Sequence, residues 1–275
     1  MIFRQLFDNT SFTYTYLIGS RKGGEALIID PVLEHVDHYL RLFRELDLKL
    51  VKAIDTHLHA DHVTGLGKLR DRTHCITLMG EKSKVDVVSM RVADSDSVKI
   101  EGISMQAIYT PGHTDDSYSF VMDDRVFTGD TLLIRGTGRT DFQNGSASEQ
   151  YDSRLNRLLK LPENTLVCPG HDYKGDTVST IAEERAFNPR LQCLLAVLVK
   201  KELGVSQARA HHPLVAADHS AGVGRADVAD HQKLVRQLAS RIEQRKVFLI
   251  GLHGQNQAFL RHREELFFKA ADQHV

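Results

Sequence analysis

The chain has few cysteines and no long apolar run, and each shortage excludes a class of protein. Only three cysteines, Cys75, Cys168 and Cys193, occur among its 275 residues, an odd number spread widely along the sequence. A disulfide framework is therefore not expected, and a reducing compartment suits such a chain best. No segment approaches the roughly 20 apolar residues that a membrane-spanning helix needs.

The chain also lacks an excess of charge of either sign. Its formal net charge is −1, and charged residues make up 26% of it. This balance indicates no electrostatic surface for nucleic acid or for a membrane. Residues 1–20 hold no uninterrupted apolar stretch and no small-residue cleavage pattern. We therefore expect no secretory signal and a cytoplasmic protein.

The most informative segment is a cluster of histidines and one aspartate at residues 57–62. His57, His59, Asp61 and His62 spell H-x-H-x-D-H and follow a mainly apolar run. Imidazole and carboxylate groups are ligands that suit zinc, iron and manganese. A strand that ends in so tight a cluster delivers several donors into one small volume. We interpret the segment as a metal-binding motif.

Three later segments repeat the order of apolar run, turn and potential ligand. His113 follows a Pro-Gly turn, Asp130 follows a single glycine, and His171 follows a Cys-Pro-Gly turn. Each of these residues alone would be unremarkable. Brought to one edge of a sheet, they would complete a metal site whose loops stand on a rigid scaffold.

Alternating strand and helix patterns predict layered α/β packing. Period-two alternation and glycine turns predict strands at 13–18, 26–29, 50–55, 76–79, 104–109, 117–122 and 125–128, with the first two forming a hairpin. Apolar residues at helical spacing predict helices at 33–46, 147–161 and 177–187, and a further helix after His62.

The series HLHADH, PGHT, TGD and GHDY resembles the metallo-β-lactamase superfamily over about residues 1–191. The resemblance implies an α/β fold of the four-layered αβ/βα sandwich type, with metals at one edge between two β-sheets. Within the superfamily, segments 127–145 and 171–191 resemble the persulfide dioxygenases of the ethylmalonic-encephalopathy-protein type. Glyoxalase II proteins are the nearest alternative, but they usually carry His-Glu-Tyr where this chain has His-Asp-Tyr at 171–173.

The dioxygenase resemblance implies a site with one Fe(II) per chain. His57, His113 and Asp130 would form the catalytic triad of ligands and leave open positions for a persulfide sulfur and dioxygen. Around them, ligands and waters would be oriented by His59, Asp61, His62 and His171. The implied reaction oxidises glutathione persulfide to glutathione and sulfite, with a glutathione-type thiol carrier and dioxygen as its small-molecule partners.

Thioester hydrolysis, as in a hydroxyacylglutathione hydrolase, would use the same residues differently. Two Zn(II) ions would share a hydroxide that attacks the thioester carbonyl, with Asp130 as the bridging ligand. The remaining ligands would be His57, His59 and His113 for one metal and Asp61, His62 and His171 for the other. The inventory of ligands alone does not separate the two reactions. A metal-binding protein without turnover would be expected to have lost some of these ligands. None of the seven ligand positions is substituted in this chain.

Arg139 and Tyr173 are the residues that the resemblance places near the glutathione moiety. A guanidinium offers a planar fork of donors to a carboxylate, and glutathione carries two carboxylates. Residues 136–139 could instead form a structural loop in which Arg139 pairs with Asp141. The sequence leaves both interpretations open.

The resemblance ends near residue 191, and the rest of the chain differs in character. Residues 232–247 and 256–271 have helical periodicity, while 204–230 have little. We therefore expect a catalytic domain over 1–191 and a partly helical C-terminal extension over 192–275, whose role the sequence does not indicate. The oligomeric state stays open, with a homodimer as the commonest assembly of such enzymes.

Overall fold

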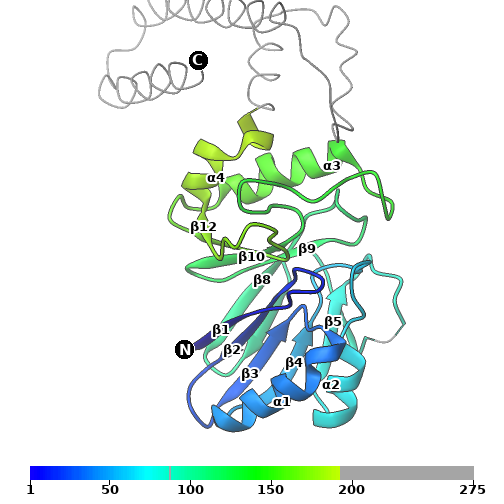
Figure 1. Ribbon diagram of the computed structural model, residues 1–275, viewed down its shortest axis with the longest axis vertical. Helices are drawn as coiled ribbons and strands as arrows, with labels where there is room; N and C mark the ends of the chain where they lie inside the picture. Colours follow the sequence, from blue (N-terminus) through cyan, green and yellow to red (C-terminus); the bar gives the residue numbers. More distant parts are fainter. Residues whose placement is uncertain (87, 193–275) are drawn as a thin grey trace, which may run out of the picture. The chain divides into compact units, whose positions relative to one another are not determined.

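Two β-sheets stacked between helices form the described part of the computed structural model, residues 1–86 and 88–192 (Figure 1). The first sheet contains, in spatial order, β1 (Ile2–Phe7), β2 (Tyr14–Gly19), β3 (Glu25–Ile29), β4 (Lys49–Ile54), β5 (Ile76–Gly80) and β6 (Met90–Val92). The second contains, in spatial order, β12 (Ser179–Thr180), β11 (Leu166–Pro169), β10 (Arg125–Gly129), β9 (Tyr118–Val121), β8 (Ile103–Tyr109) and β7 (Ser97–Ile100).

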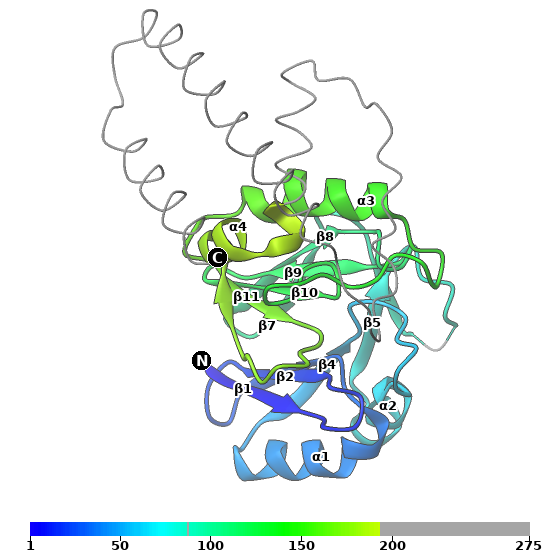
Figure 2. The same ribbon diagram turned by 45° about the horizontal axis from the view of Figure 1, so that its top comes forward.

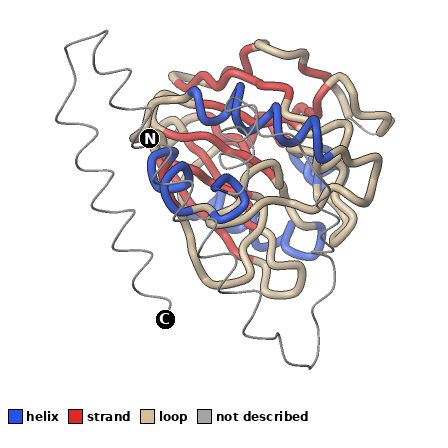
Figure 3. Tube along the Cα trace, turned by 90° about the horizontal axis from the view of Figure 1, so that it is seen from above, coloured by secondary structure: helices blue, strands red, loops and turns tan. Residues whose placement is uncertain are grey.

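Helices cover the outer face of each sheet. The first sheet is covered by the 3₁₀ turn η1 (Leu33–His35), α1 (Val36–Glu45) and α2 (Leu66–Thr73). The second is covered by α3 (Ala147–Asp152), the π-helical η2 (Ser153–Arg157), the 3₁₀ turn η3 (Leu158–Lys160) and α4 (Ile181–Phe187). Figures 2 and 3 show the same arrangement from two other directions. The predicted four-layered αβ/βα sandwich is confirmed.

Both sheets are mixed, and their parallel strands decide where a site can form. In the first sheet β1, β2 and β3 are antiparallel, whereas β3, β4, β5 and β6 run parallel. In the second, β10 and β11 are the parallel pair. Parallel strands end at the same edge of a sheet, so the loops that follow them are neighbours.

Three apolar clusters hold the layers together. One lies between the sheets, and the other two pack the helices on the outer faces. Ile29 and Ile54 belong to the inner cluster, while Ile28 and Ala53 pack with α1 and α2. Successive strand residues point to opposite faces. Strands covered on both faces are therefore apolar at nearly every position, as these runs are.

Most predicted elements are confirmed, with differences at their ends. The hairpin of β2 and β3 is present. The predicted helix at 147–161 is confirmed as a continuous helical segment, although its pitch changes from α to π to 3₁₀ along its length. The predicted helix at 177–187 begins only at Ile181, because Thr180 is extended and its hydroxyl accepts a bond from the Glu183 N–H. The strands β1, β6, β7 and β12 were not predicted. No position of β1 is buried, and the other three have only two to four residues, too few for a clear alternation.

Cys75 and Cys168 are buried and are not joined in a disulfide, which agrees with the expectation of no disulfide framework. Burial raises the pKa of the Cys168 thiol to about 12, which makes it inert at neutral pH. No helix within 1–86 and 88–192 combines the length and apolar character needed to cross a bilayer. Cys193 and the expected helices at 232–247 and 256–271 lie outside the described residues.

Candidate metal centre

The parallel strands of the first sheet carry polar residues to one edge. Asp55, Thr56 and His57 follow β4, and Asp30 follows the parallel strand β3. The Thr56 N–H donates to Asp30 Oδ1 over 2.7 Å, which ties the two strand ends together. The first histidine of the cluster is thereby held by backbone and side-chain contacts.

The second sheet supplies ligands from the ends of three strands. His113 follows β8 after a Pro-Gly turn, and Asp130 directly follows β10. His171 follows β11, the parallel partner of β10, and its backbone forms a bridge with Thr13. Loops from both sheets therefore meet at one edge of the sandwich.

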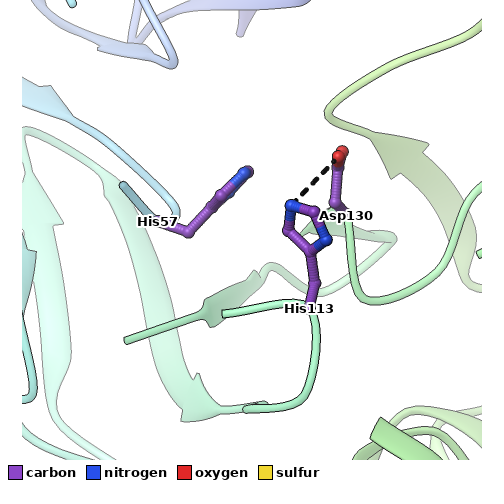
Figure 4. Close-up of side chains that lie close together, drawn as sticks. All are labelled: His57, His113 and Asp130. Atoms are coloured by element: carbon purple, nitrogen blue, oxygen red, sulfur yellow. Dashed lines mark ion pairs between the residues drawn. The ribbon is translucent and has the colours of Figure 1, made fainter. Parts of the chain in front are cut away.

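His57, His113 and Asp130 converge on one point (Figure 4). One potential ligand atom of each lies within 4.8 Å of those of the other two. His113 Nε2 is 3.5 Å from Asp130 Oδ2, and the His57 and His113 ring centroids are 5.0 Å apart. His57 and Asp130 are buried, and His113 is half-buried. Two imidazoles and a carboxylate in this arrangement can hold a divalent transition metal.

Hydrogen bonds fix which ring nitrogen faces the centre. His113 Nδ1 donates to the main-chain oxygen of Arg139 over 2.8 Å, so Nε2 keeps its lone pair. The Thr56 hydroxyl donates to Asp30 Oδ2 over 3.0 Å, so it accepts from His57 Nδ1 at 2.9 Å. Nε2 of His57 therefore also keeps its lone pair. Such outer contacts orient metal-binding histidines in general.

His59, Asp61 and His62 form a second group whose ligand atoms also lie within 4.8 Å of one another. Among the described residues, His59 Nδ1 and His62 Nε2 are buried atoms without a hydrogen-bond partner. Buried ring nitrogens without partners fit a site for a cation or a water molecule, because leaving them unpaired costs free energy. The donor set therefore fits a metal at this edge.

His171 joins the two groups through both of its ring nitrogens. Nδ1 lies 2.7 Å from Asp130 Oδ1, and Nε2 lies 2.9 Å from Asp61 Oδ2. Thr13 Oγ1 lies 3.1 Å from the same Nε2. Burial alone would lower the pKa of His171, but the adjacent carboxylates of Asp130 and Asp61 raise it to about 10. In this arrangement His171 orients two carboxylates.

Electrostatics keep Asp130 and His57 in the protonation states that a metal requires. Burial alone would raise the pKa of Asp130, but His171, His57 and His113 hold it below the ordinary value. Burial, followed by neighbouring His59, holds the pKa of His57 well below the ordinary value. An ionised carboxylate and a neutral imidazole are the forms that bind metal ions.

The two residues expected near glutathione lie in different settings. The Arg139 side chain is 64% exposed and pairs with Asp141 over 2.7 Å and 3.1 Å, as the loop interpretation expects. Its main-chain oxygen, rather than its guanidinium, contacts a site residue. Tyr173 is 63% exposed, and its ring stacks on His171, with ring centroids 6.2 Å apart and planes inclined by 5°.

Sequence reasoning missed Asp30, Thr56 and Thr13. All three are buried, and each contacts a histidine or the aspartate of the cluster at 57–62. Asp30 directly follows the apolar strand β3, as Asp130 directly follows β10. A polar residue at the end of an apolar strand was therefore a usable signal. Thr56 and Thr13 carried no comparable signal, because a threonine in a strand end is ordinary.

Comparisons with known proteins agree with this geometry. Residues 8–87 and 78–171 match the family model of the metallo-beta-lactamase superfamily. The mitochondrial persulfide dioxygenase ETHE1 of Mus musculus is 45% identical over 194 residues, which cover 70% of this chain and 76% of that protein. The hydroxyacylglutathione hydrolase of Rhodospirillum rubrum is 31% identical over 229 residues, 81% of this chain and 86% of that protein.

A solved structure gives the same result. The crystal structure of ETHE1 from Myxococcus xanthus superposes with a TM-score of 0.69 at 50% identity. The match covers 75% of this chain and 93% of that one. The identity to the Mus musculus ETHE1 exceeds that to the hydrolase by 14 percentage points, 45 against 31. The chain belongs to the metallo-β-lactamase superfamily and, within it, to the family of the ETHE1 persulfide dioxygenases.

Proposed function

We propose that the chain is a persulfide dioxygenase that uses one Fe(II) held by His57, His113 and Asp130. The observation that carries the proposal is the convergence of ligand atoms from two imidazoles and one carboxylate within 4.8 Å. Three protein ligands on one side of an iron leave positions for both a sulfur ligand and dioxygen. The identity to the ETHE1 proteins supports this reaction for the chain.

The proposed reaction converts glutathione persulfide, dioxygen and water into glutathione and sulfite. Its atoms balance because sulfite takes two oxygen atoms from dioxygen and one from water. A bound ferrous ion would supply the electron-transfer chemistry that dioxygen needs. The protein keeps Asp130 ionised, presents the two Nε2 lone pairs, and holds the rings through Arg139 and Thr56. These contacts set the site before substrate arrives.

His171 has a role that requires only one metal ion. Both of its ring nitrogens face carboxylate oxygens, those of Asp130 and Asp61. In the single-metal arrangement, the same contacts orient Asp130 toward the first metal.

A dinuclear thioester hydrolase is the second candidate, and one observation favours it. His59, Asp61 and His62 are close enough to hold another ion, and two of their ring nitrogens have no partner. The likeness to the hydroxyacylglutathione hydrolase agrees with this alternative. Two zinc ions and a shared hydroxide would be required for it.

Oxygen consumption separates the two reactions. Protein loaded with Fe(II) under anaerobic conditions should consume one dioxygen for each sulfite formed from glutathione persulfide. The zinc-loaded protein should consume none. Cleavage of S-lactoylglutathione by the zinc form, together with no oxygen uptake by the iron form, would overturn the proposal in favour of the hydrolase.

A further inference from the structure

Phe12 occupies a conformation that its residue type rarely adopts. Its φ is +63°, and among the residues that the structure describes it is the only apolar one besides glycine with positive φ. It lies in the turn between β1 and β2, where Asp8 accepts hydrogen bonds from Ser11 and Thr10. Glycine or asparagine is the usual residue at such a position. A strained aromatic residue therefore needs an explanation.

Contacts with the loop after β11 hold Phe12 beside the metal centre. Its main-chain oxygen accepts from the Asp172 N–H over 3.2 Å. The next residue, Thr13, bridges to His171 through the backbone, and its hydroxyl also lies 3.2 Å from Asp61 Oδ2. The turn is thus joined directly to residues of the candidate site.

The Phe12 ring extends an aromatic surface outward from the site. Its centroid lies 5.4 Å from that of Tyr173, which stacks on His171. Phe12 is 40% exposed and Tyr173 is 63% exposed, so both rings face solvent while they touch each other. Burial in the core therefore does not explain the Phe12 ring. We call these two side chains the aromatic shelf.

We propose that Phe12 is a specificity-determining residue, whose ring extends the surface of Tyr173 along the peptide part of the thiol carrier and sets the preference for peptidic carriers. The inference rests on the proposed function and names the carrier that its site prefers. A thiol sulfur bound at the centre would leave the rest of its carrier outside it, and Tyr173 and Phe12 are exposed rings joined to the centre through His171. Planar peptide groups can lie against aromatic faces. Glutathione contains such groups, whereas a single-residue carrier such as cysteine contains none. The shelf therefore distinguishes glutathione persulfide from cysteine persulfide.

Surface packing of the turn is the competing explanation for the Phe12 ring. Its ring also lies 6.3 Å from that of Phe7, which packs on Tyr14. If this were the whole role of Phe12, removing the ring would change stability and affect both persulfides equally. A change in preference between the two substrates would not follow from a packing role.

The first experiment measures that preference as the ratio of kcat/KM for glutathione persulfide to that for cysteine persulfide. Phe12→Asn keeps a residue that tolerates positive φ and removes the ring. We expect the ratio to fall about three- to tenfold, the range of one aromatic contact, and Phe12→Tyr to restore it. Phe187→Asn is the matched control, because Phe187, at the end of α4, is exposed and its ring packs against Arg135. An unchanged ratio in Phe12→Asn would overturn the proposal.

The second experiment detects binding without turnover. The chain contains no tryptophan, so Phe12→Trp and Phe187→Trp each carry a single reporter. With iron-loaded anaerobic protein, reduced glutathione should produce a saturable change in the Phe12→Trp emission, and cysteine should not. No saturable change, or equal changes with cysteine or at residue 187, would contradict the shelf. If neither persulfide supports oxygen uptake, the proposed function fails, and this fluorescence result still decides the inference.

Discussion

At the scale of single residues, Asp30 organises the centre without being one of its expected ligands. Its carboxylate accepts from the Thr56 N–H and hydroxyl and lies 3.2 Å from His59 Nε2. Thr56 in turn accepts from His57 Nδ1. The orientation of His57 therefore depends on a carboxylate from the neighbouring strand.

Replacing Asp30 by asparagine should weaken iron binding by about 10- to 100-fold, the usual effect of losing such an outer contact. The amide offers one acceptor oxygen where three donors converge, so at least one contact is lost. A competition titration with a ferrous chelator under anaerobic conditions measures the change. Asp47→Asn is the control, because Asp47 is exposed and also has positive φ. Equal affinities for the two variants would contradict the role of Asp30.

Asp8 predicts a pH-dependent contribution to stability. Burial alone would raise its pKa, but hydrogen bonds from Ser11, with His35 and Thr10, hold it below the ordinary 3.8. A carboxyl with a depressed folded pKa stabilises the fold above its unfolded pKa and loses that effect as pH falls through the folded one. Asp8→Asn should therefore lower the free energy of unfolding by about 1–2 kcal/mol at pH 7.

Urea denaturation of Asp8→Asn and the parent protein at several pH values checks this. The difference between the two proteins should shrink as pH falls below about 4, where Asp8 of the unfolded parent chain is protonated. A difference that stays constant from pH 7 to pH 3 would show that the charge of Asp8 is not the cause.

The expected ligands could be recognised from the sequence because their spacing follows strand ends. The cluster at 57–62 and the isolated His113, Asp130 and His171 all lie in such positions. Contacts through the backbone could not be recognised in this way. The main-chain oxygen of Arg139 orients His113, and any residue at that position offers the same atom.

At the scale of secondary-structure elements, α3 fixes the turn that carries His113. A Cβ at Gly112 would lie 2.2 Å from the backbone of Gln150 in α3, and Gly112 has φ +133°. The Gln150 side chain also donates to the main-chain oxygen of Gly138 over 3.0 Å. The helix thus packs against both loops that hold the His113 ring.

Gly112→Ala should therefore separate the turn from α3 and displace His113. We expect iron affinity to fall by more than about tenfold, since a misplaced ligand costs more than one outer contact, whose loss costs about tenfold or more. Metal analysis after anaerobic loading at a free iron concentration near the Kd of the parent protein measures the loss. Gly67→Ala in α2 is the matched control, because a Cβ there meets no atom within 4 Å. Iron content in Gly112→Ala equal to that of the parent protein would show that the turn can move without cost to the site.

Element boundaries show why periodicity alone was insufficient. The apolar spacing of 147–161 indicates a helix, and the chain there is helical throughout. Its pitch changes after Asp152, where the Ser153 hydroxyl donates to the main-chain oxygen of Pro111. That contact joins segments 42 residues apart in sequence, so no local pattern reports it.

At the scale of the whole described fold, the centre joins the two sheets. His57 comes from the first sheet, while His113 and Asp130 come from the second. An ion held by all three would link the sheets in the folded state and would find no such site in the unfolded chain. Metal binding should therefore stabilise the fold by mass action.

Iron removal should lower the melting temperature. At a free iron concentration about 100 times Kd, binding contributes about 2.7 kcal/mol, which corresponds to roughly 5–10 °C for a protein of this size. Anaerobic calorimetry with and without a chelator measures the shift. His57→Ala should show almost no shift, and a full shift in that variant would indicate that iron binds elsewhere.

The sequence predicted the layers and the edge at which the loops meet, because strand alternation and polar strand ends are local patterns. The boundary at residue 191, the homodimer and the cytoplasmic location stay predictions. The boundary depends on residues that follow 192, and the other two depend on contacts with other molecules. Periodicity along the chain reports neither.

The number and identity of metal ions bound per chain test the central claim most directly. Protein loaded anaerobically with equal Fe(II) and Zn(II), then freed of excess metal, can be assayed for both elements and for oxygen uptake. The account predicts that dioxygenase activity rises in proportion to iron and reaches its maximum at one iron per chain. Maximal activity that requires two metal ions per chain, or activity that follows zinc, would contradict it.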